Sequence, residues 1–284
     1  MAASAPAIAP PGGSTRPARI ALATLLALAL AALLGPGLVG FAPEHSDWQW
    51  IDAAPGWRHG HWLGTDAIGR DLLARTLAAL RVSLLVAVSA GSLALLLGLG
   101  YGALAGTLGG FGERLMMRAL DVLSALPFLL IVVVLMTVFG RHGGLLIGAI
   151  AVYVCLDLAR MVRAEAARIR VLPFVDAASA LGAGTWWLLT RHILPNVRGF
   201  ALVYLSLAVP QAILVESFLS FLGLGLDEPA VSLGTLLAEG AQEIADAPWV
   251  LIAPTVVLAA LLLALGVLGD RLRAAQRSRH GGAA

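Results

Sequence analysis

The sequence predicts an all-α membrane protein, a polytopic bundle of six transmembrane helices. Hydrophobic residues make up 59% of the 284 residues and charged residues only 13%, whereas about a quarter of a soluble domain is charged. The mean hydropathy is +0.88. Apolar stretches of about 20 residues, the length that crosses a ~30 Å hydrocarbon layer, recur along the chain. One long interval of mixed polarity, residues 164–198, is expected to be a loop between spans four and five.

The N-terminal part is expected to contain a tail, one transmembrane helix and an external segment. Residues 1–19 are rich in Ala, Pro and Gly and are predicted to be disordered. Residues 20–41 form the first predicted span. A basic residue before an apolar stretch also occurs in cleaved signal peptides, but this stretch is too long for the core of one. Residues 42–79 are polar and rich in Trp, Asp and His, so they are expected to lie outside the membrane.

The other five spans are predicted within residues 80–270. Glycines recur in the first of them, at Gly98, Gly100, Gly102 and Gly106. Small residues at these spacings favour close approach of another helix. A basic tail, residues 271–284, follows the last span. The five apolar stretches cover residues 80–106, 115–139, 145–162, 199–222 and 249–268.

The distribution of arginine predicts the orientation of the bundle. All 19 basic residues are Arg, and basic residues favour the cytoplasmic side of a membrane. With six spans and a cytoplasmic N-terminus, fourteen arginines lie inside and five outside. Residues 223–248 carry five acidic residues and no Arg, as an external loop would. Both termini and the loop of residues 164–198 are therefore expected to be cytoplasmic.

The middle of this loop has a helical pattern. Pro173 suits the first turn of a helix, and Asp176 suits the positive end of the helix dipole. Gly182 is expected to end this helix, and a second helix is expected to end at Pro195. An apolar face outside the membrane needs a surface that receives it. The residues that share this face, at i, i+3, i+4 and i+7, are Phe174, Ala177, Ala178 and Leu181.

Ionisable residues within the predicted spans each allow two interpretations, because they are costly there. Asp121 is either a ligand for a substrate or an ion or, as we favour, a capping residue or the partner of an arginine such as Arg118 near the membrane surface. Glu216 either lines a pathway or bonds to a neighbouring helix, and the sequence favours neither. Asp157 and Arg160 are three residues apart and can pair on one helix face. There are too few such groups for a proton relay through the bilayer.

No catalytic or metal-binding constellation is visible in the sequence. The chain has no Lys, so it cannot carry a phosphate-binding loop of the usual ATPase form. If ATP is needed, another chain must hydrolyse it. The single Cys, Cys155, lies in an apolar run. His59 and His61 could share a metal ion, but the sequence places no third ligand, so no metal site is predicted.

The loop resembles the cytoplasmic EAA loop of the inner-membrane permeases of ABC importers. That pattern is Glu-Ala-Ala, three residues, Gly, nine residues, Ile, one residue and Leu-Pro. Here residues 176–178 read Asp-Ala-Ala, Gly182 stands at the Gly, and Leu194 and Pro195 stand at the end. The departures are Asp in place of Glu and His192 in place of Ile. The spacing agrees throughout.

Further segments resemble the dipeptide, oligopeptide and nickel branch of these permeases. Residues 61–75, HWLGTDAIGRDLLAR, look like its LGTD-x-x-GRD segment. A literal Glu-Ala-Ala at residues 165–167 has no Gly six positions after its first residue, so we do not assign it to the motif. The resemblance extends over roughly residues 60–275 in the order of the family. Other matches are residues 117–127, 159–163, 216–225 and 268–273.

This resemblance implies the partners of the chain and its location. A second homologous permease subunit would complete the pore, with two ATP-binding subunits on the cytoplasmic side and an extracytoplasmic solute-binding protein. The chain itself would hold no cofactor, because ATP and Mg would bind the partner ATPase subunits. The location would be a bacterial cell (inner) membrane, which the chain would cross several times, and no nucleic acid would be involved.

The resemblance also implies the functional residues. Two positions, Asp121 and Glu216, stay open as pathway or bracing residues. In the external segment, the implied residues would bind the external protein or, as we favour, brace the bundle; they are Gly64, Thr65, Asp66, Gly69, Arg70 and Asp71. The ATPase-coupling loop would use Phe174, Val175, Asp176, Ala177, Ala178, Leu181, Gly182, Leu194 and Pro195.

The predicted function is that of a permease subunit that moves di- or oligopeptides, or similar small solutes, into the cytoplasm with ATP hydrolysed by partner chains. An importer of nickel or another small complex is the alternative within the family, since that branch shares the motifs. An ion-gradient-driven secondary transporter would instead need acidic or His residues at mid-bilayer and no docking loop. An intramembrane enzyme would need a catalytic set, so the chain is not expected to be an enzyme.

Overall fold

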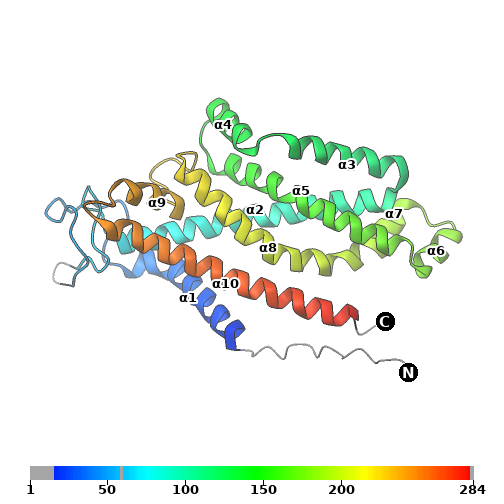
Figure 1. The fold of residues 1–284 in the computed structure, drawn as a ribbon, viewed down its shortest axis with the longest axis horizontal. Helices are drawn as coiled ribbons and strands as arrows, with labels where there is room; N and C mark the ends of the chain where they lie inside the picture. The colour runs from blue at the N-terminus through cyan, green and yellow to red at the C-terminus, as the bar shows by residue number, and fades with distance from the viewer. Residues whose placement is uncertain (1–15, 58–59, 282–284) are drawn as a thin grey trace, which may run out of the picture.

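A computed structural model describes residues 16–57 and 60–281. Within these ranges the regular elements are helices, apart from two isolated β-bridges near residues 46–71. Five long helices run side by side along the molecule (Figure 1). They are α1 (Arg16–Leu38), α2 (Leu72–Leu108), α5 (Gly143–Arg170), α8 (Leu194–Phe221) and α10 (Pro248–Gly281).

These five helices are long and apolar enough to cross a membrane, and the described residues contain a sixth span only if a bent pair is counted as one. The pair is α3 (Gly110–Ala125) and α4 (Phe128–Phe139), which meet at 78°. The sequence predicted one continuous helix over residues 115–139. Pro127 breaks it, because a proline restricts the preceding residue to extended backbone, and Leu126 has φ −76° and ψ 133°. The all-α polytopic bundle is confirmed, but its third span is not straight.

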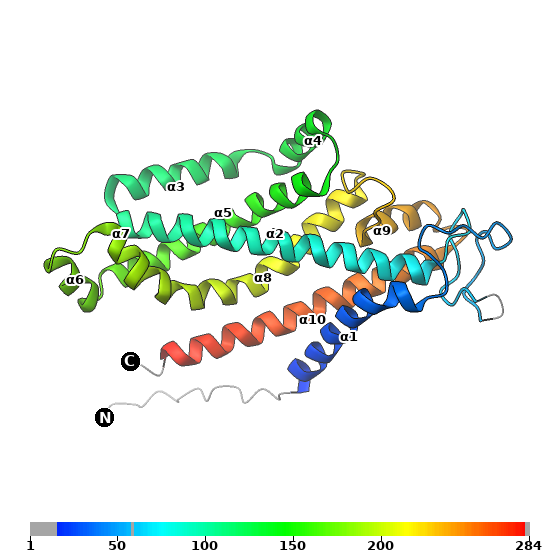
Figure 2. The same ribbon diagram turned by 180° about the vertical axis from the view of Figure 1, so that it is seen from behind.

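The core of the bundle is the packing of α2 against α5 and α8, and α2 runs through the middle of the molecule (Figure 2). Glycines on α2 allow the close approach to α5. A Cβ atom on Gly102 would lie 2.4 Å from the carbonyl oxygen of Ala159, and one on Gly106 would lie 2.6 Å from the Cβ atom of Ala166. Contacts shorter than van der Waals distance exclude any side chain at these positions. The prediction that these glycines serve helix packing is therefore confirmed for Gly102 and Gly106, but it is wrong for Gly100, which is exposed and has no atom within 4 Å of an added Cβ.

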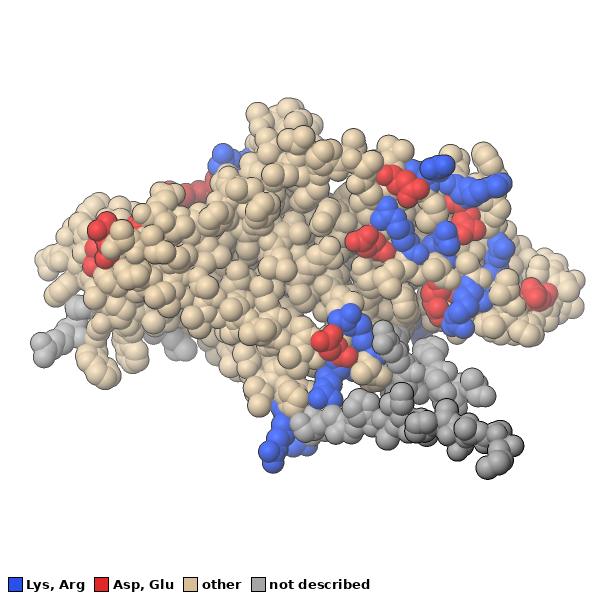
Figure 3. Space-filling model, in the orientation of Figure 1, with Lys and Arg blue, Asp and Glu red and all other residues tan. Residues whose placement is uncertain are grey.

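The short helices gather at opposite ends of the bundle (Figures 1 and 2). We call the first the α6 end: it holds α6 (Pro173–Ala180), α7 (Thr185–Leu188) and the π-helical turn η1 (Leu189–Ile193). The opposite end, the α9 end, holds α9 (Leu233–Gln242) and the segment before α2. In the view of Figure 3 most visible arginines lie toward the α6 end, and a further group of charged side chains lies at the lower edge near the middle of the molecule.

Several predicted boundaries shift because helices extend beyond their apolar stretches. α1 begins at Arg16 inside the expected tail, since Pro17 suits a first helical turn. α2 begins at Leu72 inside the expected external segment, where the side chain of Asp71 caps it. α10 continues through the expected basic tail to Gly281. The rest of both predicted tails lies outside the described residues.

Candidate functional site

The α6 end begins with a short helix that is held by one buried side chain. Pro173 lies in the first turn of α6, as predicted, and α5 ends just before it at Arg170. The side chain of Val175 is only 1% exposed and packs in the apolar cluster that contains Ile169 and Leu188. The sequence placed Val175 on a contact surface for a partner. That placement is wrong, because this side chain faces its own chain.

The outer side of α6 is exposed and apolar. The side chains of Phe174 and Ala177 are exposed, and that of Leu181 is 90% exposed. Ala178 is half-buried and packs against the same cluster as Val175. Three of the four residues predicted to share one helix face therefore remain open to solvent. A monomeric soluble surface rarely leaves an aliphatic side chain so exposed next to others, which indicates a contact surface.

The turn after α6 depends on a glycine. Gly182 has φ +90°, a left-handed conformation that side chains disfavour. The chain then enters α7, η1 and α8 without a break. Pro195 was predicted to end a helix, but it lies in the first turn of α8. The wide π-helical turn η1 immediately precedes it. A regular α-helix through this position would need a backbone N–H group at residue 195, which proline lacks. Leu194 and Pro195 thus begin a membrane helix.

At the α9 end, Asp66 is the centre of a buried ion-pair network. Its carboxylate accepts hydrogen bonds from the backbone N–H of Arg70 at 2.9 Å and from the Nε of Arg70 at 2.7 Å. It also accepts from Arg75 at 2.6 Å. Arg75 continues to Glu239 on α9 through contacts of 2.6 and 3.0 Å. The network ties the segment before α2 to α2 and α9.

The neighbouring residues of the same segment also have internal partners. One oxygen of Asp71 accepts from the backbone N–H of Ala74 at 2.7 Å and caps α2, while the other lies 2.9 Å from the Nδ1 of His61. The hydroxyl of Thr65 donates to the carbonyl of Trp50. His59, considered with His61 as a metal ligand, lies outside the described residues. Within residues 16–57 and 60–281, no three His, Cys, Asp or Glu residues are grouped to hold a metal ion.

Two glycines of this segment are required by close backbone contacts. Gly64 and Gly69 have φ +83° and +76°. A Cβ atom would lie 2.5 Å from the carbonyl oxygen of Ala53 at the first position and 2.2 Å from that of Asp47 at the second. The LGTD-x-x-GRD segment therefore folds as a compact unit whose polar side chains point to its own backbone and to α9.

Glu216 connects three helices in the interior. Its side chain is 1% exposed. The hydroxyl of Ser83 on α2 donates to its carboxylate at 2.9 Å, and the hydroxyl of Ser220 donates at 2.8 Å. Ser83 in turn accepts from the backbone N–H of Leu233, the first residue of α9, at 3.1 Å. Of the two interpretations left open for Glu216, these contacts match bonding to a neighbouring helix.

Comparison with known proteins now decides the family. Residues 98–280 match the family described as binding-protein-dependent transport system inner membrane component. The oligopeptide transport system permease protein OppC of Haemophilus influenzae is 42% identical over 90% of this chain and 83% of its own. OppC of Escherichia coli is 43% identical over 90% and 85%. The dipeptide transport system permease protein DppC of Bacillus subtilis is 40% identical over 75% and 67%.

The chain belongs to this family. It is the permease subunit of an ABC importer and a multi-pass membrane protein. The family is that of the membrane component, so the permease is not itself the ATPase subunit of such a system.

Within the permease, the acidic residue Asp121 has a different partner from the one expected. Its carboxylate lies 3.8 Å from the guanidinium of Arg160 on α5, which also contacts Asp157 at 3.1 Å. The pairing of Asp157 with Arg160 was predicted from their spacing and is confirmed. The expected partner of Asp121 was Arg118 on the same helix. Arg160 lies on α5 instead, and it reaches Asp121 because α3 folds back along α5.

The sequence missed the two most important partners in the permease. Arg75 lies within the LGTD-x-x-GRD segment and joins Asp66 to Glu239, a role that the motif does not indicate. Glu239 is 164 residues away from Arg75 along the chain, so no spacing rule could have paired them. Ser83 was missed for the same reason, since its partners lie on α8 and α9.

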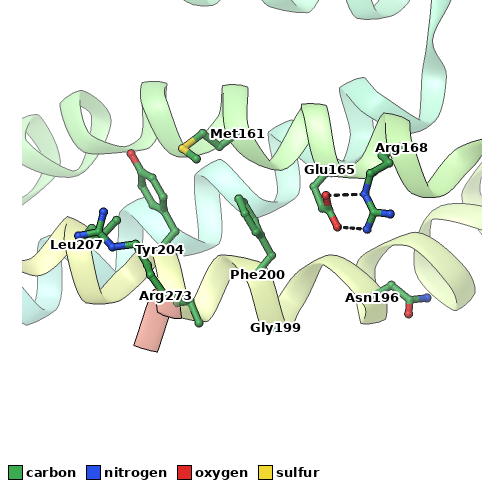
Figure 4. Close-up of a pocket in the computed structure, with 10 residues that line it drawn as sticks. Met161, Glu165, Arg168, Asn196, Gly199, Phe200, Tyr204, Leu207 and Arg273 are labelled. Atoms are coloured by element: carbon green, nitrogen blue, oxygen red, sulfur yellow. Dashed lines mark hydrogen bonds and ion pairs between the residues drawn. The ribbon is translucent and has the colours of Figure 1, made fainter. Parts of the chain in front are cut away.

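A groove of the permease lies between α5, α8 and α10 near the α6 end and has a volume of about 690 Å³ (Figure 4). Phe200 and Tyr204 on α8 face Met161 on α5 across it. At its rim Glu165 accepts hydrogen bonds from Arg168 at 3.0 and 2.6 Å. Glu165 is the first residue of the literal Glu-Ala-Ala, which thus lies within α5 and not in the exposed loop.

Proposed function

We propose that this permease imports di- or oligopeptides or similar small solutes, using ATP that partner subunits hydrolyse. The solute class is supported by the relatives, whose names specify oligopeptide and dipeptide transport and which match over most of both chains. The mode of coupling is supported by one structural observation. A short helix, α6, presents an exposed apolar side at one end of the bundle while Val175 anchors it to the spanning helices.

The exposed side of α6 would dock in a groove of an ATP-binding subunit. Phe174, Ala177 and Leu181 form the contact in this proposal, and Asp176 remains its polar anchor. Closure of the ATPase pair on ATP binding moves α6 as a rigid body. Because Val175 lies in one apolar cluster with residues of α5, α7 and η1, this motion is transmitted to α5 and α8 and tilts the bundle.

The orientation follows from the same arrangement. We place the α6 end and both termini in the cytoplasm, because most of the arginines lie on that side of the six spans. The acidic α9 end then faces outward, toward a solute-binding protein. The remaining partners are a second permease subunit and two ATP-binding subunits, which hold ATP and Mg²⁺. The membrane is a bacterial inner membrane.

Uptake by the reconstituted complex tests the proposal. The permease is co-purified with its second permease subunit and two ATP-binding subunits and placed in proteoliposomes with the binding protein outside. We expect labelled tri- to pentapeptides to accumulate only with ATP inside the vesicles and only with the binding protein present. Uptake driven by an ion gradient without ATP would contradict the proposal. Uptake of Ni²⁺ with no peptide uptake would contradict the solute class.

A further inference from the structure

Four of the seven tryptophans of the permease lie within residues 48–62, at the α9 end. Three of their side chains are open to solvent: the exposed fraction is 70% for Trp48, 89% for Trp57 and 69% for Trp62. Several large aromatic side chains that are exposed in one short segment indicate a contact surface. We call residues 42–63, which carry these side chains, the Trp segment.

The turn that carries Trp48 is fixed to the compact LGTD-x-x-GRD unit. The residue before it, Asp47, donates its backbone N–H to the carbonyl of Gly69 at 2.9 Å. The carboxylate of Asp47 accepts from the backbone N–H of Gln49 at 3.1 Å, and its carbonyl accepts from the N–H of Trp50 at 3.0 Å. The backbone on both sides of Trp48 is therefore held in place while the side chain projects outward.

Trp62 is held beside the same turn by its neighbour His61. The ring of His61 is buried between two carboxylates, 2.9 Å from Asp71 and 3.8 Å from Asp47. Because Trp48 directly follows Asp47 and Trp62 directly follows His61, the two tryptophans belong to adjoining parts of the surface. Side chains on a fixed backbone lose little conformational freedom when a partner binds, so this arrangement suits a contact with another molecule.

The charge of the Trp segment favours a protein over a membrane surface as the partner. Residues 42–63 contain three acidic residues, one Arg and no Lys. Segments that bind the surface of anionic membranes are instead rich in Lys and Arg. An acidic surface with exposed aromatic side chains is complementary to a protein face that has basic side chains and apolar pockets.

The position of the segment shows from which direction a partner would approach. Residues 42–71 form the outermost part of the α9 end, beyond the ends of α1, α2 and α10 (Figures 1 and 2). A second permease subunit would pack sideways against the spanning helices, within the membrane. A partner that contacts the Trp segment approaches along the helix axes from outside the membrane, as a solute-binding protein does in the proposed orientation.

We propose that Trp48, Trp57 and Trp62 form the surface on which the solute-binding protein docks, through a face of that protein with basic side chains and apolar pockets. Tryptophan is enriched among the residues that dominate the energy of protein–protein interfaces. Residues 64–71 hold the Trp segment in place instead of making this contact themselves. The inference rests on the proposed function, because that function places a solute-binding protein at the α9 end.

Binding of the purified solute-binding protein to the full complex tests this surface. The complex with both permease subunits and both ATP-binding subunits is placed in lipid nanodiscs and titrated with labelled binding protein that carries peptide. Trp48→Ala and Trp62→Ala should each weaken binding at least about tenfold. The matched control is Gln49→Ala, an exposed side chain of the same turn, which should bind like the native complex. All three variants should keep the native melting temperature, because these side chains are exposed.

Uptake by proteoliposomes gives an independent measurement on the same variants. The half-saturating concentration of the binding protein should rise about tenfold for Trp48→Ala and Trp62→Ala. The uptake rate at saturating binding protein should stay unchanged, because the ATP-binding subunits and the spanning helices are untouched. Binding to the native complex should also weaken as ionic strength rises, because salt screens charges at an exposed surface.

The outcomes separate this inference from the proposed function. Native affinity in both tryptophan variants, in a complex that still imports peptide, overturns the docking surface and leaves the proposed function standing. Binding that is insensitive to salt overturns the basic character of the partner face. Absence of ATP-dependent peptide uptake by the native complex, at any concentration of binding protein, contradicts the proposed function and this inference with it.

Two further measurements test the other occupants of the surface. Lipids brominated close to the headgroup should not quench the fluorescence that Trp57→Ala removes; quenching would assign the segment to the membrane surface and overturn the proposal. Trp62→Cys, with Cys155 replaced by Ala, should cross-link to the binding protein. Cross-linking to the second permease subunit instead would also overturn the proposal.

Discussion

The hydroxyl of Ser83 on α2 joins the carboxylate of Glu216 on α8 to the first backbone N–H of α9. Ser83 donates to Glu216 at 2.9 Å and accepts from Leu233 at 3.1 Å, and both side chains are buried. One serine thus closes a contact among three helices at the α9 end. Gly234 lies at the same contact, since a Cβ atom there would be 2.2 Å from the carbonyl oxygen of Ser217.

Replacing Ser83 by Ala should destabilise the permease. Ser83→Ala leaves the N–H of Leu233 and one oxygen of Glu216 without this hydroxyl, and a buried polar group without a partner costs about 1–3 kcal/mol. The measurement is thermal unfolding of the purified complex in detergent, followed by tryptophan fluorescence. The control is Ser92→Ala, an exposed serine on the same helix, which should be neutral. Equal melting temperatures for the two variants would contradict the role given to Ser83.

Replacing Arg75 should be more damaging than replacing any exposed arginine. Arg75→Ala removes the more deeply buried of the two arginines that bridge Asp66 and Glu239, and Arg70 remains as the other. Removal of one partner from a buried ion pair costs about 3–5 kcal/mol. We expect a large loss of thermal stability and early proteolysis in α9.

The matched control for Arg75 is Arg81, which lies on the same helix and is exposed. Arg81→Ala should change the free energy of unfolding by less than about 0.5 kcal/mol. If both variants are equally stable, the network at the α9 end does not hold α9 to α2.

A charge on the outer side of α6 should uncouple the permease from its ATPase. Ala177→Asp and Leu181→Asp leave the fold intact because both side chains are exposed. They should nevertheless abolish co-purification of the ATP-binding subunits and peptide uptake. Ala178 is a poorer choice for this test, since its half-buried side chain also packs against the permease.

The control for the α6 variants is Ser179→Asp, an exposed position on the opposite side of the same helix. It should retain the ATP-binding subunits and most of the uptake. Normal uptake by Leu181→Asp would show that the exposed side of α6 is not the docking surface.

The stability of the α9 end should depend on pH through Glu243. Burial raises the pKa of Glu243 above its ordinary value of 4.5, and the neighbouring carboxylates of Asp66, Asp52 and Glu239 raise it further. The folded protein then binds this proton more tightly than the unfolded chain does. Ionised Glu243 is therefore destabilising, and its contribution to stability falls as pH rises through the raised pKa.

Glu243→Gln removes this charge and should raise the melting temperature at pH 7.5 by roughly 2 °C, a small effect because the side chain is partly exposed. The difference should shrink as pH falls through the raised pKa toward 4.5, because the carboxyl of Glu243 then becomes protonated in the folded protein. A difference that stays constant across this pH range would rule out titration of Glu243 as its cause.

Prediction from the sequence succeeded where the signal is local. Gly102 and Gly106 were correctly assigned to helix packing, and Pro173 was correctly placed in the first turn of α6, because backbone geometry depends on neighbouring residues. Prediction failed where the sequence allows a side chain to face either the bundle or the solvent. Val175 and Ala177 are both small apolar residues on one short helix, yet only the packing of α6 on the bundle shows that Val175 is buried.

By itself the sequence determined the membrane class, the approximate spans and the position of the loop that carries α6. Hydrophobic length, arginine distribution and residue spacing are properties of the chain that need no contacts. The tertiary structure alone decided that Arg75 reaches Glu239, that Glu216 reaches Ser83, and that Asp121 on α3 lies 3.8 Å from Arg160 on α5. These partners lie on different helices. The distances between these partners depend on how the helices pack and on where Pro127 bends the third span. The spacing of residues along the chain contains no information on either.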